Sequence, residues 1–223
     1  TLELKRVSDA IDAKIAYVSE DRHVYGAVPD ISITQNITLP SLKSFVNGIS
    51  IDSDLETVKA QEYKKLLNIK CKDVAQPISA LSGGNQQKVI LGKWILCDSD
   101  ILILDEPTAG LDPAGRDEIL GLVSKMHREL GITILLVSHS MEDVAEYVDR
   151  IIVMNHGAVM FDALPKQVFA HYKELEAVGL AAPQVTYLVH ELAERGLPVD
   201  TQATTAREAA QTILSALREK NVI

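Results

Sequence analysis

Short continuous runs of apolar residues recur along the chain and are separated by amphipathic stretches. Four runs have the length of buried strands, and they cover residues 15–18, 101–104, 132–137 and 150–154. Four stretches carry apolar residues at helical spacing, and they cover residues 54–67, 85–96, 113–130 and 141–148. Buried strands that alternate with helices are typical of a parallel sheet. The pattern therefore predicts an α/β fold.

Two of the expected helices are defined in more detail by their side chains. The helix at 54–67 is expected to bury part of one face, formed by Leu55, Val58, Tyr63, Leu66 and Leu67. The helix at 113–130 is expected to end at Gly131, because glycine commonly follows the last helical residue. Residues 23–53 are rich in turn formers and mixed in pattern, whereas the stretch 54–97 is all helical and looks like an insertion into the sheet. We take residues 34–97 or so as this helical subdomain.

After about residue 180 the pattern changes to two amphipathic helices. Val185, Leu188, Val189 and Leu192 follow the spacing of one helical face, and residues 206–217 form a second such helix. The two helices either pack on their own domain or mediate dimerisation, and the sequence leaves both interpretations open. We expect a domain over residues 1–180 and a helical tail over residues 181–223.

Composition narrows the class of protein. The 223 residues are 47% hydrophobic and 24% charged, which is enough apolar content for a core. The net charge of −9 argues against a nucleic-acid partner, which would require a basic face. Cys71 and Cys97 form no CxxC pair, which fits a reducing cytoplasm, and no apolar run is long enough to span a bilayer.

Two adjacent carboxylates follow the apolar run at 101–104. In open α/β sheets, ligands bind at the carboxyl ends of the strands, where Asp105 and Glu106 stand. Adjacent strand residues point in opposite directions, so Asp105 could hold Mg²⁺ while Glu106 orients and deprotonates a water molecule. The alternative is a strand that simply enters a polar loop.

A glycine pair opens the helix at 85–96. In the segment Leu81–Gln87, Ser82 is suited to cap the helix, while Gly83 and Gly84 let backbone amides approach a phosphate at a helix amino end. The alternative is an ordinary helix start. His139 directly follows the strand at 132–137, where it could donate a hydrogen bond to a γ-phosphate or be structural. The other five histidines are expected at the surface.

These segments occur in an order that is more specific than any one of them: LSGGNQQ, then Asp-Glu-Pro-Thr, then Ala109–Asp112, then the strand before His139. The set resembles the ATPase domains of ABC transporters over nearly the whole chain. The resemblance implies ATP and Mg²⁺ as cofactors. It implies that Ser82, Gly83, Gly84 and Gln86 belong to the signature motif, Asp105 and Glu106 to Walker B, Asp112 to the D-loop and His139 to the switch.

The resemblance also implies partners. These are a transmembrane subunit, contacted through the helical subdomain and about residues 20–60, and a second ABC ATPase domain, so the chain is placed on the cytoplasmic face of a membrane. Glu20 stands where most members have the Q-loop glutamine. Two rival functions are a soluble ABC ATPase and a non-catalytic module that donates only its signature motif.

One expected motif is missing from the sequence. No glycine begins the phosphate-loop pattern G-x-x-x-x-G-K-[ST], and the single Gly-Lys pair, Gly92-Lys93, precedes Trp94 inside an expected helix. In the family this loop comes earlier than the point where this chain starts. The chain begins at Thr1, which suggests a truncated or processed start. We therefore expect a P-loop NTPase-like parallel sheet that lacks its N-terminal part, and impaired ATP binding by the chain alone.

Two subfamilies are represented in the two parts of the chain. Residues 1–108 resemble the second ATPase domain of ribose- and galactose-type sugar importers, which has glutamate in the Q-loop. Residues 109–223 resemble an energy-coupling factor ATPase of vitamin and metal importers. The change falls within Leu104–Thr108, a stretch that both subfamilies share. The transported cargo therefore stays open between a sugar and a micronutrient.

Overall fold

The computed structural model describes residues 3–220. The chain divides into two compact units, the first ending at Val137 and the second beginning at Ser138. The boundary expected near residue 180 and the subdomain limits of 34–97 stay predictions. The elements of the first unit are α1 (Val7–Asp12), β1 (Ile15–Val18), a π-helical turn (Arg22–Gly26), α2 (Ile33–Thr38), a 3₁₀ segment (Leu39–Phe45), β2 (Val46–Asn47), β3 (Ser50–Ile51), α3 (Ser53–Leu66), a 3₁₀ turn (Ile78–Ala80), α4 (Gly83–Leu96), β4 (Ile101–Asp105), α5 (Pro113–Leu130) and β5 (Thr133–Val137).

A three-stranded parallel sheet forms the frame of the first unit. Its strand order is β1-β4-β5, so β4 is hydrogen-bonded on both sides. Leu104 is opposite Val18 on one side and Leu136 on the other, and β5 extends the pairing to Asp105 and Val137. The parallel α/β architecture predicted from the alternation of strands and helices is thus confirmed.

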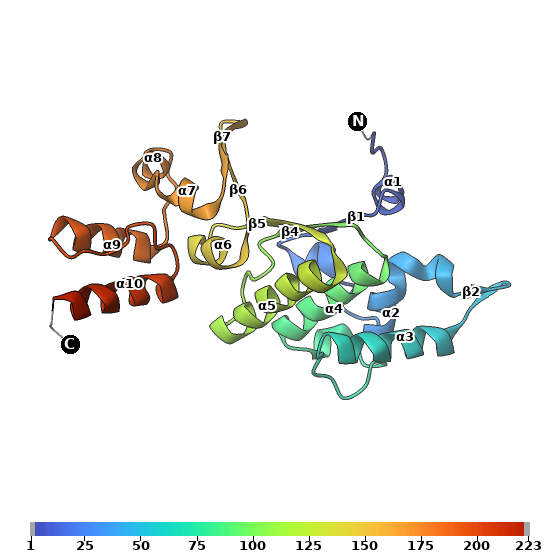
Figure 1. The fold of residues 1–223 in the computed structure, drawn as a ribbon. Helices are drawn as coiled ribbons and strands as arrows, with labels where there is room; N and C mark the ends of the chain where they lie inside the picture. Colours follow the sequence, from blue (N-terminus) through green and yellow to red (C-terminus); the bar gives the residue numbers. More distant parts are fainter. Residues whose placement is uncertain (1–2, 221–223) are drawn as a thin grey trace. The chain divides into compact units, whose positions relative to one another are not determined.

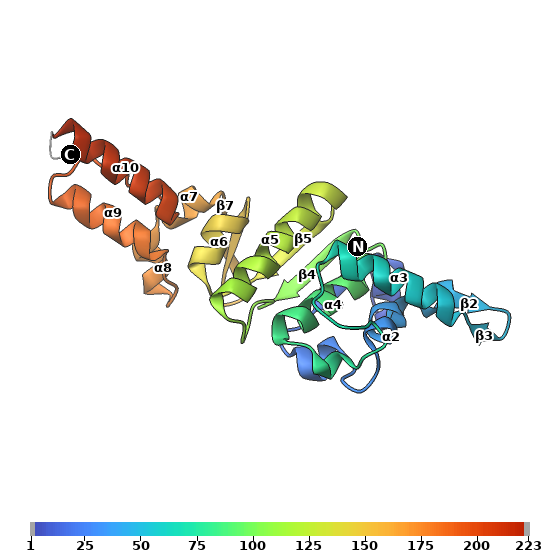
Figure 2. The same cartoon turned by 90° about the horizontal axis from the view of Figure 1, so that it is seen from below.

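Helices α4 and α5 cover one face of this sheet (Figures 1 and 2). Leu102 and Leu104 of β4 are almost fully buried in a core with Ile90 of α4 and Ile119 of α5. A buried lysine, Lys88 of α4, crosses between the helices: its ammonium lies 2.6 Å from the Glu118 carboxylate and donates to the Asn68 carbonyl at 2.9 Å. The helices are therefore held to each other as well as to the sheet.

The opposite face of the sheet is largely uncovered. Tyr17 of β1 is 51% exposed, and Leu135 and Val137 of β5 are 49% and 47% exposed. The expectation that residues 132–137 form a fully buried strand was therefore wrong: alternate side chains of β5 lie on this bare face. Parallel sheets are normally covered on both faces, so the bare face is an apolar surface fit for burial.

A second group of helices packs on the far side of α4. Ile33 and Ile37 of α2 are fully buried there together with Ala60 of α3. The sequence pattern missed α2, whose residues lie in a stretch that had looked turn-rich and mixed. Figure 2 shows the hairpin of β2 and β3 beyond the amino end of α3.

The buried face of α3 differs from the predicted one. Of the five predicted residues, Leu67 is buried and Tyr63 packs against the same core, whereas Leu55, Val58 and Leu66 are exposed. Glu56 and Ala60 are buried as well. Thr38 at the end of α2 donates a hydrogen bond to the Glu56 carboxylate, so a polar pair occupies the packed face. The apolar residues near the amino end of α3 were therefore a poor guide, because Ala60 and Glu56 occupy the packed face there.

The second unit contains a small sheet and a series of short helices. Its elements are α6 (Met141–Tyr147), β6 (Ile151–Asn155), β7 (Ala158–Ala163), α7 (Pro165–Phe169), α8 (Tyr172–Ala177), α9 (Gln184–Glu194) and α10 (Ala206–Glu219). The strand predicted at 150–154 exists as β6, but it pairs in antiparallel fashion with β7 in a separate two-stranded sheet. Its core includes Val153 of β6, Phe169 of α7 and Leu175 of α8.

The two tail helices pack on each other and on the rest of the second unit. Val189 of α9 is fully buried with Ala209 of α10. Lys166 of α7 forms an ion pair with Glu208 of α10 at 2.7 Å. Leu188 and Leu214 stay 47% and 46% exposed, so each helix keeps part of its apolar stripe at the surface. Between residues 3 and 220, no helix has both the length and the apolar content needed to cross a bilayer.

The two faces of the sheet should respond differently to truncation of a leucine. We expect Leu104→Ala to lower the free energy of unfolding by about 2–5 kcal/mol, because it leaves a cavity in the core. Leu135→Ala should lower it by about 1 kcal/mol or less, because that side chain is already half exposed. Urea denaturation of both variants measures the difference, and equal losses would show that the face bearing Leu135 is covered in solution.

Candidate functional site

The carboxyl end of β4 presents the two predicted carboxylates in different backbone environments. Asp105 is the last residue of the strand. Glu106 lies outside it and has a φ of +42°, in the left-handed region that glycine favours and longer side chains rarely adopt. Its amide donates to the Val137 carbonyl at 3.0 Å. The extended backbone of β4 therefore ends at Asp105, and the expected strand alternation does not continue through Glu106.

Tyr17 of β1 is part of this site although the sequence gave no sign of it. Its hydroxyl donates to an Asp105 carboxylate oxygen at 2.8 Å. That hydrogen bond, followed by partial desolvation, raises the pKa of Tyr17 above its ordinary value. Asp105 and Tyr17 can meet because they belong to adjacent parallel strands and share the bare face of the sheet. The contact gives the Asp105 carboxylate a fixed partner.

The glycine pair forms the first turn of α4, two residues earlier than predicted. Ser82 occupies the N-cap position, but its side chain makes no capping bond to the helix backbone. The hydroxyl instead accepts a hydrogen bond from the Asn85 side-chain amide at 2.9 Å. The predicted capping role of Ser82 was therefore wrong. The first amides of a helix have no acceptor within the helix, so this amino end keeps donors for an anion.

Two further predicted residues have structural contacts. The Gln86 side-chain amide donates to the Leu81 carbonyl at 3.1 Å, which fixes the approach of the chain to α4. Asp112 caps α5: its carboxylate accepts a hydrogen bond from the Gly115 amide at 2.7 Å. A nucleotide-binding role for either residue stays a prediction.

Arg22 joins the segments that the sequence had treated as separate motifs. Its guanidinium donates from Nη1 to the Ala109 carbonyl at 2.8 Å. A β-carbon placed on Gly83 would lie 3.0 Å from Nη2 of the same group. In the sequence, Arg22 follows Glu20 and Asp21, and nothing in its spacing indicated this contact.

Glu20 and His139 are both exposed. Glu20 lies between β1 and the turn at Arg22–Gly26, and its charge contributes to the raised pKa of Tyr17. His139 lies two residues beyond β5, at the start of the second unit. The first unit thus brings Tyr17 close to Asp105 and to the charge of Glu20. Separately, Arg22 connects the first turn of α4 with the loop that follows Glu106. The role of His139 stays a prediction.

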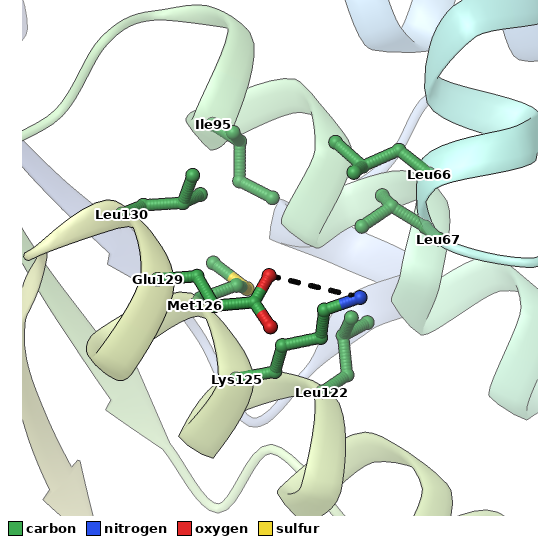
Figure 3. Close-up of a pocket in the computed structure, with 8 residues that line it drawn as sticks. All are labelled: Leu66, Leu67, Ile95, Leu122, Lys125, Met126, Glu129 and Leu130. Carbon is green, nitrogen blue, oxygen red and sulfur yellow. Dashed lines mark ion pairs between the residues drawn. The ribbon is translucent and has the colours of Figure 1, made fainter.

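A small hollow elsewhere in the first unit is lined almost wholly by apolar side chains. Figure 3 shows it between the end of α3, α4 and α5, with the Lys125 ammonium 3.8 Å from the Glu129 carboxylate. Its lining residues are Leu66, Leu67, Ile95, Leu122, Lys125, Met126, Glu129 and Leu130. It contains none of the predicted site residues and is best described as a seam between packed helices.

The residues of the site fit a phosphate better than they fit a metal ion alone. A β-carbon on Gly84 would meet no atom within 4 Å, so the amino end of α4 is open to a bound group. Across residues 3–220, no three His, Cys, Asp or Glu side chains gather closely enough to hold a metal ion. Asp105 could contribute one ligand to Mg²⁺, which commonly takes one or two carboxylates together with phosphate oxygens and waters.

Comparison with known proteins identifies relatives of two kinds. Residues 3–109 match the family model described as ABC transporter. The chain is 45% identical over 218 residues to the energy-coupling factor transporter ATP-binding protein EcfA2 of Caldanaerobacter subterraneus subsp. tengcongensis, a match that covers 96% of this chain and 76% of that protein. It is 40% identical over 151 residues to the ribose import ATP-binding protein RbsA of Bacillus cereus, covering 68% of this chain and 30% of that protein.

Solved structures give the same picture of the fold. The structure of cbiO1 from Clostridium perfringens, described as part of the ABC transporter complex cbiONQ, has a TM-score of 0.60 and 29% identity, and the match covers 85% of this chain and 72% of that one. The chain spans about half the length of several curated relatives that it matches, 49–50% of three EcfA2 proteins.

The contact between Tyr17 and Asp105 predicts a pH effect. In Asp105→Asn the ionisation of Tyr17 should move to lower pH, because the carboxylate that favours the neutral phenol is gone. In the parent chain the contact should add stability below the ordinary tyrosine pKa of about 10, and this should be lost as the pH rises through the raised value. Ultraviolet titration of phenolate measures the shift, with Tyr17→Phe identifying its step. Asp117→Asn is the control, and an unmoved step in Asp105→Asn would contradict the contact.

Proposed function

Because the chain belongs to the ABC transporter family of ATP-binding proteins, we propose that it acts as the ATP-hydrolysing subunit of an importer. In this proposal Glu106 is the general base for an attacking water, and Asp105 is a ligand of Mg²⁺. The first turn of α4 binds the γ-phosphate through its backbone amides. Bound ATP would supply the phosphoryl group that is hydrolysed. The residues of this chain would orient and polarise the bound ATP.

The observation that carries the proposal is the open amino end of α4. Gly83 and Gly84 are half-buried there, a β-carbon on Gly84 would meet no atom within 4 Å, and Ser82 beside them is exposed with its hydroxyl accepting from Asn85. Helix amino ends favour negative charge because of the aligned peptide dipoles. The loop 109–112 lies next to this turn, since a β-carbon on Gly83 would be 3.3 Å from the Leu111 side chain.

The backbone at Glu106 supports its proposed role as a base. Non-glycine residues in the left-handed region cost about 1–3 kcal/mol, and such residues cluster at functional sites. The turn places Glu106 beyond the strand end, and its carbonyl accepts from the Ala109 amide at 3.0 Å. The carboxylate is thus attached to a closed turn, which limits the positions it can take relative to a bound nucleotide.

A composite ATP site follows from the sequence of the chain. These 223 residues contain no G-x-x-x-x-G-K-[ST], so the cradle for the β- and γ-phosphates must come from another segment. We infer that the chain donates its signature turn to ATP held by a second ATPase domain, and that it binds ATP weakly when alone. The second candidate function, a non-catalytic module that donates this turn, is favoured by the same absence.

The importer role rests on the relatives. The matched proteins are named as a transporter and as an importer subunit. We propose that the chain lies at the cytoplasmic face of a membrane, bound to a transmembrane subunit through the region of residues 20–60. EcfA2 and ribose importer relatives leave the cargo open between a micronutrient and a sugar.

A mixed dimer tests the composite site. The chain is combined with a complete ABC ATPase domain whose hydrolysis is blocked, and ATP is counted by equilibrium dialysis. We expect one ATP per dimer, because only the partner supplies a phosphate loop. Ser82→Arg should abolish it, because the bulky side chain would occupy the place of the phosphate.

The matched control is Ser53→Arg, since Ser53 is likewise an exposed serine at the start of a helix. This variant should still bind one ATP per dimer. Two ATP per dimer, or one that survives Ser82→Arg, would rule out the composite site.

Hydrolysis is tested by Glu106→Gln after a segment with a phosphate loop is supplied in front of residue 1. Turnover should fall by about 10²–10⁴-fold while ATP remains bound, because the amide keeps the shape of the side chain but cannot accept the proton of water. Phosphate release and retained nucleotide are measured together, with Glu129→Gln on α5 as the control. Turnover at the parental rate would show that Glu106 is not the base.

A further inference from the structure

The guanidinium of Arg22 lies between two segments that are far apart in the sequence. Nη1 donates to the Ala109 carbonyl at 2.8 Å, across 87 residues of chain. Nη2 faces Gly83, the first residue of α4, whose added β-carbon would be only 3.0 Å away. A β-carbon on Gly110 would lie 3.7 Å from Nη2 and 3.8 Å from Nη1. One side chain therefore contacts both the first turn of α4 and the loop 109–112.

Gly83 and Gly110 differ from Gly84 in the space around them. A methyl group on Gly83 would press on the guanidinium, whereas one on Gly84 would meet no atom within 4 Å. Gly110 has a φ of +67°, which lets the loop turn close to Arg22. The absence of side chains at Gly83 and Gly110 thus makes room for the guanidinium.

The contact of Arg22 with the loop and the first turn of α4 adds little to stability. The Nε–H of Arg22 is buried and finds no acceptor among residues 3–220. A buried donor without an acceptor lowers stability, and a cation beside a helix amino end is repelled by the helix dipole. An apolar side chain of similar length would avoid both costs, so the polar contact is better explained by a requirement on geometry.

We propose that Arg22 is a positioning residue that clamps the loop 109–112 onto the first turn of α4. The clamp makes the loop and the glycine pair one rigid surface, so that a nucleotide presented by a second domain meets both in a fixed arrangement. The use of this surface rests on the proposed function, whereas the clamp itself is a property of the chain without nucleotide. Arg22 does not need to touch the nucleotide.

Amide hydrogen exchange on the full chain tests the clamp. In Arg22→Met the amides of Ala109 and Leu111, which close the turns of the loop, should exchange about tenfold faster or more. The amides of β4 should keep their parental rates, because the sheet does not depend on the guanidinium. Arg128→Met, an exposed arginine on α5, is the control and should leave the loop unchanged.

Gly83→Ala gives a second test with Arg22 intact. The added methyl group should displace the guanidinium and accelerate exchange in the loop 109–112, while α4 stays folded because alanine favours a helix more than glycine does. Gly84→Ala is the matched control and should leave the loop at its parental rate. If Arg22→Met leaves the loop protected, the clamp is wrong. Gly83→Ala supports the clamp only together with that result, because its methyl group also meets the Leu111 side chain at 3.3 Å.

Rescue by lysine separates positioning from a general loss of structure. Arg22→Lys keeps a charged donor for the Ala109 carbonyl but has no second nitrogen to face Gly83, so exchange in the loop should fall between that of the parent and that of Arg22→Met. Faster exchange throughout β4, β5 and the loop alike in Arg22→Met, or no rescue by lysine, would overturn the proposal. Because no nucleotide is present, a failure of the proposed function does not alter these outcomes.

Discussion

The pairing of β4 with a parallel strand on each side is the constraint on which the rest of the first unit depends. It fixes the direction of the strand, so its carboxyl end delivers Asp105 to the same edge at which β1 and β5 end. It also divides the side chains into two sets, one buried under α4 and α5 and one on the bare face. The contact between Tyr17 and Asp105 exists only because both belong to that second set. The register of the strands therefore determines which side chains can meet at the site.

The sequence predicted most elements of the fold because their signals were local. Helix α5 was predicted with its observed bounds, since its apolar spacing and Gly131 both mark them, and Gly131 has the expected φ of +70°. Predictions about which side is buried were less successful, because burial depends on partners that are distant in sequence. Helix α3 packs through Ala60 and Glu56, whose neighbours on α2 were not recognised as a helix. The strand β6 was found, but its pairing with β7 depends on a hairpin that the pattern did not reveal.

For the site, the ordered motifs predicted residue types and positions, and the structure gives contacts for Asp105, Ser82, Gln86 and Asp112. The carboxylates at the end of β4 and the glycine pair at the start of α4 are where the motifs placed them. The contact between Arg22 and Ala109 could not be predicted, because a hydrogen bond to a backbone carbonyl 87 residues away leaves no periodic trace. The buried Lys88 was missed for a similar reason, since a lysine in a helix is normally expected at the surface.

The left-handed backbone at Glu106 has a consequence for the substitutions that this position can accept during evolution. Glycine or asparagine would suit the conformation better, yet either would remove the carboxylate, whereas β-branched residues fit neither the conformation nor the chemistry. The residues that best suit this backbone and the residues that supply a carboxylate are therefore different. A substitution at this position therefore alters the backbone energy and the charge beside Asp105 together.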